Sequence, residues 1–170
     1  MTNYAGGSVT ELNSSGALVG NFKPGGAKFY APDTIAIDAA GNAWIPNQYG
    51  NSVSELTSSG AAVGNFKPSG ANFNQPYGVA IDSSDNVWIP NFNGKSVTEL
   101  NSNGALIGNF APQGANLNGA DSVAIDSSGN VWVTNKNGNT IGGLVGAAEP
   151  VTTPLVACLK KTPPTTACKP

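Results

Sequence analysis

The chain contains no histidine and no arginine, and only 11% of its 170 residues are charged. Nucleic-acid binding relies on clustered Lys and Arg against phosphates, and base recognition in particular favours Arg. Here the eight lysines are scattered and the net charge is -2, so we expect no nucleic-acid partner. The ten carboxylates are also dispersed. Without histidine or grouped acids we expect no metal site and no cofactor.

Cysteine is scarce and long apolar runs are missing. No run approaches the roughly 18 apolar residues of a membrane-spanning helix, so we expect no membrane span. The only cysteines, Cys158 and Cys168, lie ten residues apart near the C-terminus. In an oxidising compartment they could close a small disulfide loop worth at best ~2 to 4 kcal/mol, whereas in a reducing one they would stay free.

The start of the chain has neither the basic residues nor the apolar segment of a signal peptide. The abundance of Asn, Ser, Thr and Gly, with few charges, is typical of secreted or cell-surface β-proteins. We therefore expect an extracytoplasmic location, secreted or periplasmic, for a longer parent protein whose export signal lies upstream of this chain.

What the sequence does contain is a tandem repeat of 44 residues. The pentad Ser-Val-Thr/Ser-Glu-Leu occupies residues 8–12, 52–56 and 96–100, with a degenerate copy at 140–144. The same register holds for three tryptophans, three Ile-Asp pairs and three asparagines, which are Trp44, Trp88 and Trp132, Asp38, Asp82 and Asp126, and Asn47, Asn91 and Asn135. A fixed period of about 40 to 50 residues indicates one supersecondary unit that is copied, as in a propeller or solenoid.

One repeat predicts four short strands, at residues 78–82, 86–91, 96–101 and 105–110. Each is rich in β-formers and bounded by Gly, Asn, Asp or Ser turns. The Asn93-Gly94 pair predicts positive φ in the second turn. No segment shows a helical apolar period, so helical repeats are excluded. The predicted fold class is all-β, a β-propeller of four-stranded antiparallel blades.

Residues 76–91, from Pro76-Tyr77-Gly78-Val79-Ala80-Ile81-Asp82 to Val87-Trp88-Ile89-Pro90-Asn91, together with Lys95-Ser96-Val97-Thr98-Glu99-Leu100, resemble the NHL repeat and the related virginiamycin B lyase-like repeat of bacteria. The resemblance covers residues 5–146. It implies a β-propeller, usually of about six or seven blades. Such repeats serve binding proteins, scaffolds and a few lyases, so the resemblance implies the fold more strongly than a function.

Counting strands by the repeat gives about three and a half blades. Residues 8–22 supply only a third and a fourth strand, complete blades follow at 34–66 and 78–110, and a further blade runs over 122–144. Its fourth strand would have to come from the tail, at residues 153–158.

A ring closes with four to eight blades. We therefore expect the chain to be the C-terminal part of a longer propeller, with repeats over residues 1–146 and a Thr/Pro-rich tail over 147–170. The competing reading is a short chain that closes by head-to-tail assembly. In either case the open edges are expected to pair with the missing blades or with another chain.

The recurring residues have structural readings that outweigh functional ones. The tryptophans are expected to pack between blades rather than form a ligand platform. The Ile-Asp aspartates are expected to cap turns, since each turn offers too few oxygens for calcium, and only Asp82 with Asp85 could form a weak cation site. The repeated Glu11, Glu55 and Glu99 are expected to be solvated or bonded to backbone rather than paired for catalysis.

Function is more readily sought where the repeats differ. The segments before each first strand vary, and in propellers they border the central channel. These segments predict a ligand-binding rim, although ordinary drift of loop sequence is an alternative reading. The candidate residues of the rim are Tyr30, Asp33, Gln75, Tyr77 and Asp121.

The sequence favours a noncatalytic binding or scaffold module that engages a protein or a glycan through these loops. No catalytic residue is predicted. The alternative is a fragment of a virginiamycin B lyase-like enzyme whose catalytic residues lie in missing blades, because the family resemblance implies histidine and metal chemistry and this chain has no histidine. A third reading, an RNA-binding NHL surface, conflicts with the negative net charge.

Overall fold

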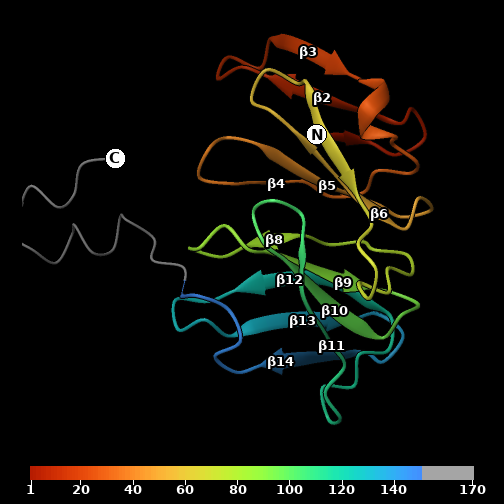
Figure 1. The fold of residues 1–170 in the computed structure, drawn as a ribbon, viewed down its shortest axis with the longest axis vertical. Helices are drawn as coiled ribbons and strands as arrows, with labels where there is room; N and C mark the ends of the chain where they lie inside the picture. Colours follow the sequence, from red (N-terminus) through yellow and green to blue (C-terminus); the bar gives the residue numbers. More distant parts are fainter. Residues whose placement is uncertain (151–170) are drawn as a thin grey trace, which may run out of the picture.

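Each repeat folds into one antiparallel sheet in the computed structural model, which describes residues 1–150 (Figure 1). The elements are β1 (Thr2–Asn3), β2 (Ser8–Leu12), β3 (Leu18–Phe22), the 3-10 turn η1 (Gly25–Ala27), β4 (Ala36–Ile37), β5 (Ala43–Asn47), β6 (Ser52–Leu56), β7 (Ala62–Phe66), β8 (Ala80–Ile81), β9 (Val87–Asn91), β10 (Ser96–Leu100), β11 (Leu106–Phe110), β12 (Ala120–Ile125), β13 (Val131–Asn135) and β14 (Thr140–Leu144).

Sequential strands pair in order without crossovers. The first sheet is β1-β2-β3, the second β4-β5-β6-β7, the third β8-β9-β10-β11 and the fourth β12-β13-β14. The second and third sheets confirm the predicted four-stranded antiparallel blade. Within residues 1–150, no helix is long and apolar enough to span a membrane.

Several predicted strands differ from those observed. The first sheet was expected to lack its first two strands, but β1 pairs Thr2 with Val9 and Asn3 with Ser8, and so supplies the end of the second strand. The first strands of the second and third sheets, β4 and β8, are only two residues long, because the pairing with the second strand is interrupted after an isolated bridge, Pro32 with Asn47 and Pro76 with Asn91. The predicted strand at 153–158, together with Cys158 and Cys168, lies outside the described residues.

The turn between the second and third strands also differs in detail. Positive φ falls not on Asn93 or Gly94 but on Lys95, at 51°. The register equivalents Asn51 and Asn139 share this left-handed conformation, at 47° and 49°. Asparagine tolerates this conformation better than most residues, so the backbone is more strained at Lys95 than at Asn51 or Asn139.

Proline within the second strand is accommodated at the open side of the ladder. Pro90 is the penultimate residue of β9, and its carbonyl accepts a hydrogen bond from the Tyr77 amide at 3.3 Å. Its nitrogen faces the same side, away from β10, so the missing N–H leaves the β9-β10 ladder intact. Pro46 in β5 has the same arrangement, with the Asp33 amide as donor at 3.2 Å.

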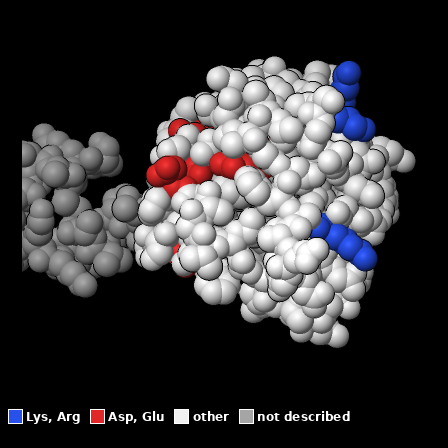
Figure 2. Space-filling view, turned by 60° about the horizontal axis from the view of Figure 1, so that its bottom comes forward, with Lys and Arg blue, Asp and Glu red and all other residues white. Residues whose placement is uncertain are grey.

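The strand order places two sets of connections at opposite ends of the sheets. One end, the rim face, carries the hairpins between second and third strands and the long loops that join successive sheets. The other end, the Asp-turn face, carries the turns that begin with the repeated aspartate. All five lysines of the described residues lie in rim-face connections, namely Lys23, Lys28, Lys67, Lys95 and Lys136. Figure 2 shows the carboxylates gathered on one side of the visible surface and the lysines on the opposite side.

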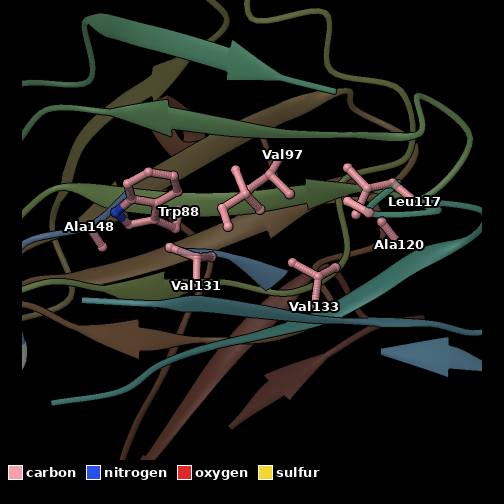
Figure 3. Packing of buried hydrophobic residues seen from close by; sticks show 9 residues of the cluster. Trp88, Val97, Leu117, Ala120, Val131, Val133 and Ala148 are labelled. Atoms are coloured by element: carbon pink, nitrogen blue, oxygen red, sulfur yellow. The ribbon is translucent and has the colours of Figure 1, made fainter. Parts of the chain in front are cut away.

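The hydrophobic core lies between the sheets, in three separate clusters. Trp88 and Val97 of the third sheet face Val131 and Val133 of the fourth, as Figure 3 shows. The Trp88 ring stacks on Phe110 with 5.6 Å between centroids. Trp44 fills the equivalent position between the second and third sheets, and both indoles are fully buried. The prediction that tryptophan packs between blades is thus confirmed for these two.

The aspartate turns fix the same indoles. Asp82 accepts hydrogen bonds from the amides of Ser84 and Asn86, at 3.0 and 2.9 Å, through one carboxylate oxygen. Its other oxygen accepts the Trp88 indole N–H at 3.2 Å. Asp38 and Asp126 bond their own turns and tryptophans in the same way. The turn-capping prediction is confirmed, with an added role in orienting the indole.

Trp132 provides an internal comparison, because it occupies the same register as Trp88 but is 47% exposed. We predict that Trp88→Ala lowers the free energy of unfolding by about 3 to 5 kcal/mol, the usual cost of emptying a buried aromatic site. Trp132→Ala should lower it by roughly 1 kcal/mol or less. Urea unfolding followed by far-ultraviolet circular dichroism measures both. Equal losses would contradict the inter-sheet role of the indole.

Candidate functional site

Three tyrosines meet on the rim face between the first and second sheets. Tyr4 comes from the hairpin between β1 and β2, Tyr49 from the hairpin between β5 and β6, and Tyr30 from the loop that joins the two sheets. Tyr49 is the common neighbour, with its ring 6.1 Å from Tyr4 and 5.8 Å from Tyr30, both edge to face. The three rings are 43 to 62% exposed.

These rings border a cavity of about 340 Å³, here called the tyrosine pocket. Phe29, Gly6 and Gly7 complete much of its wall. Lys23 also lines it, but its ammonium group donates to the Gly6 carbonyl at 2.8 Å. The pocket therefore offers aromatic faces and phenolic hydroxyls, with its one cation already hydrogen-bonded to the wall.

A chain of hydrogen bonds continues from this pocket across the next sheets. The Tyr4 hydroxyl donates to Gln48 Oε1 at 2.5 Å, and Gln48 Nε2 donates to the Tyr77 hydroxyl at 2.5 Å. The Tyr77 ring then lies 4.9 Å from the ring of Phe92. Hydrogen bonding with Tyr49, together with burial, raises the pKa of Tyr4 to about 12. Tyr4 therefore keeps its proton throughout the physiological range.

Asp33, Tyr77 and Asp121 occupy one repeat position, at the entrance to each first strand. The first strand of a blade is the one nearest a propeller's channel. Burial raises the pKa of the Asp33 carboxyl, the charge of Asp121 raises it further, and Lys136 opposes the shift. Burial and the Asp33 charge raise the pKa of Tyr77. At this end of the sheets the Asp121 charge therefore raises the pKa of Asp33, and the charges of Asp33 and Asp121 raise the pKa of Tyr77.

The five residues predicted from loop variation all lie on the rim face, but they form more than one group. Tyr30 belongs to the tyrosine pocket. Asp33, Tyr77 and Asp121 form the register set described above. Gln75 lies apart, where its Oε1 accepts a hydrogen bond from Asn93 Nδ2 at 2.8 Å. Whether these residues bind a ligand stays a prediction.

Sequence reasoning did not select Tyr4, Gln48 or Tyr49. The signal that could have found two of them is the register itself, since position 4 becomes Gln48, Phe92 and Lys136 in later repeats. This position changes chemistry in every repeat while its neighbour, Asn3, Asn47, Asn91 or Asn135, does not. Variation beside a fixed residue marks a side chain that the blade itself does not require.

The opposite face contains glutamates that were expected to be solvated or bonded to backbone, and solvation was wrong for two of them. Glu55 and Glu99 are buried, with only 4% and 7% of each exposed, because each lies opposite a tryptophan inside an inter-sheet core. Burial, and then the charge of Asp82, raises the pKa of Glu99 to about 7. Burial likewise raises the pKa of Glu55. Within residues 1–150, no group of three or more acids or cysteines is placed to hold a metal ion.

The raised pKa of Glu99 predicts a pH dependence of stability. The folded state holds this proton at pH values where the unfolded state has already released it, so stability falls as pH rises from about 4.5 to 7. We expect the free energy of unfolding to drop by about 3 kcal/mol over this window through Glu99 alone. Glu99→Gln should remove that drop in urea titrations between pH 5 and 8.

The matched control is Glu11→Gln, which alters the same repeat position where the side chain is exposed. It should keep the wild-type pH profile. A wild-type profile for Glu99→Gln as well would contradict a protonated, buried Glu99.

The fold is similar to that of several solved structures. A virginiamycin B lyase from Staphylococcus aureus, solved with quinupristin as a catalytically inactive histidine-to-alanine variant, gives a TM-score of 0.73 at 18% identity over 89% of this chain and 51% of the lyase. A streptogramin B lyase gives 0.69 at 18% identity, over 87% and 48%. A protein of unknown function from Bacteroides caccae gives 0.59 at 16% identity, over 86% and 53%.

At these identities the likeness shows the fold alone, and it confirms the partial β-propeller predicted from the repeat. The chain spans about half the length of these solved proteins. No protein-family model matches the sequence, and no curated protein matches it.

Proposed function

We propose that this chain is a noncatalytic binding module that takes a glycan on the rim face of a β-propeller. The observation that carries the proposal is the tyrosine pocket, where Tyr4, Tyr30 and Tyr49 surround about 340 Å³ of open space. Tyrosine combines a large apolar ring with a polar tip and few rotatable bonds, so it gives contact area at low entropic cost. A sugar ring has the matching chemistry, with apolar C–H faces and hydroxyl edges.

The polar groups around the pocket also suit hydroxyl-bearing ligands. Gln48 joins Tyr4 to Tyr77 by hydrogen bonds and thereby holds Tyr4, which lines the pocket, in place. The Lys23 ammonium donates to the Gly6 carbonyl, which holds it at the wall, and its remaining N–H groups can donate to a hydroxyl of a ligand. These contacts support a saccharide, and the preformed wall lowers the cost of binding.

The proposal predicts that Tyr49→Ala removes most of the affinity for a glycan retained by the wild-type chain. Tyr49 contacts both other rings, so its loss opens the centre of the pocket, and a central contact is typically worth more than about 1 kcal/mol. A glycan array first identifies the saccharide that the wild-type chain retains best. Calorimetry with that saccharide should then give a dissociation constant at least tenfold higher for Tyr49→Ala than for the wild type.

Val63→Ala is the matched control, because Val63 is similarly exposed, at 52%, but lies on β7 away from the pocket. It should bind like the wild type. The proposal fails if the array retains no saccharide, or if Tyr49→Ala binds as tightly as Val63→Ala. Retention of a protein rather than a glycan in a parallel pull-down would move the function to protein binding.

A second candidate, a part of a propeller lyase, is favoured by the likeness to the virginiamycin B and streptogramin B lyases. The lyase variant named above lost its activity with a histidine, and this chain contains none. Lyase chemistry of that kind would therefore need residues outside these 170. Incubating the purified chain with quinupristin and following the mass of the product tests this candidate, and turnover would favour it over the binding module.

A further inference from the structure

The tyrosine pocket contains a single charged side chain, and its charge is positive. Lys23 lies in the pocket wall, and none of the other lining residues is an acid or a lysine. The Lys23 ammonium donates to the Gly6 carbonyl at 2.8 Å, which holds it at the wall. Because an ammonium group has three donors, this bond leaves the others for a ligand.

A glycine leaves room beside this ammonium group. Gly7 has a left-handed backbone, with φ at 57°, and a Cβ added there would lie 3.5 Å from Lys23 Nζ. At the next interface the same register position is Asn51, whose side chain accepts a hydrogen bond from the Gln75 amide at 2.8 Å. A side chain that is present between the second and third sheets is therefore missing beside Lys23, which widens the pocket at its cation.

Among the described residues, three tyrosines and a lysine share these register positions only between the first and second sheets. The later interfaces place amides, a phenylalanine, a lysine or an alanine there. The positions are Tyr4, Lys23, Tyr30 and Tyr49 at the first interface, Gln48, Lys67, Asn74 and Asn93 at the second, and Phe92, Ala111, Asn118 and Asn137 at the third. Since the same blade forms each time, the fold does not require this combination.

The distribution of charge over the molecule also favours an anion at this face. The rim face carries five lysines but only two of the ten carboxylates, Asp33 and Asp121. Figure 2 shows this separation of the two signs of charge. Neither rim-face acid lines the tyrosine pocket. An excess of one sign of charge raises the local concentration of ligands of the opposite sign.

We propose that the tyrosine pocket selects an acidic saccharide, whose ring packs on the tyrosines and whose carboxylate or sulfate group accepts hydrogen bonds from the Lys23 ammonium. This inference rests on the proposed function and names its ligand class. Hydrogen bonds between two charged groups are stronger than neutral ones. The Gly6 carbonyl already restrains the lysine, so less side-chain entropy is lost when the ligand binds.

The first experiment compares acidic saccharides with neutral partners of the same skeleton. A glycan array carries oligosaccharides that end in glucuronate, galacturonate or sulfated galactose, each beside its glucose or unsulfated galactose counterpart. The full chain should retain an acidic member best. Calorimetry with that saccharide and its counterpart should give at least about fivefold tighter binding of the acidic form. The uronate and sulfate pairs show which anionic group is preferred.

The array separates failure of this inference from failure of the proposed function. If a neutral saccharide is retained best, or if both members of the pair bind equally, the selection of an acidic ligand is overturned while glycan binding stands. If no saccharide is retained, glycan binding itself is overturned, and the inference falls with it.

Two variants of the full chain test whether Lys23 is the group that recognises the anion. Lys23→Met keeps the apolar stem and removes the charge of an exposed side chain, so the fold should be retained. The ratio of the neutral to the acidic dissociation constant should fall from at least about fivefold to about one. A change in this ratio reports the pairing of Lys23 with the anionic group, whichever contacts Lys23 makes to sugar hydroxyls.

Lys67→Met is the matched control, because Lys67 follows β7 as Lys23 follows β3, is equally an exposed rim-face lysine, and does not line the tyrosine pocket. It should keep the wild-type ratio. A wild-type ratio for Lys23→Met would show that the anionic group is recognised elsewhere and would overturn the proposal. Equal losses in the two variants would assign the selectivity to the overall charge of the rim face and would overturn it as well.

Discussion

The insertion of one indole between the second and third sheets, and of another between the third and fourth, is the interaction on which much of this structure depends. Backbone hydrogen bonds join strands within a sheet, but the sheets meet one another mainly through side chains. Trp44 and Trp88 are the largest fully buried side chains of the described residues, and each lies at the centre of an apolar cluster that two sheets share. Burial of that area is what holds the sheets at a fixed spacing.

Polar contacts then fix where each indole and each loop lies. The repeated aspartate caps its own turn and accepts the indole N–H, so turn and core are set together. At the other end, Asn91 Nδ2 donates to Ser96 and Thr98 of the next strand, and Thr98 donates to the Ala71 carbonyl of the loop that enters the sheet. These buried contacts anchor the bases of the rim-face loops, while the loop tips stay free to vary in sequence.

The candidate site follows from this division between fixed and variable positions. Asn3 and Asn47 repeat because each blade needs them, whereas the adjacent Tyr4 and Gln48 do not. Since neighbouring sheets are held at constant spacing, side chains at equivalent positions approach one another across the interface, as Tyr4 and Gln48 do. A repeated scaffold therefore brings unlike residues from successive repeats into one polar and aromatic surface.

The sequence by itself determined the period, the four-stranded blade and the aspartate caps, because each is a local pattern copied in every repeat. It also predicted the packing of Trp44 and Trp88, but not that Trp132 is 47% exposed, because that depends on which sheet lies alongside. Tertiary structure decided the features that depend on which sheet lies alongside. Glu55 and Glu99 are buried and Glu11 is exposed, although all three share one motif, because only the first two lie opposite a tryptophan within an inter-sheet core. Tyr4, Tyr30 and Tyr49 likewise come from separate segments, and their meeting depends on the spacing of two sheets rather than on any local pattern.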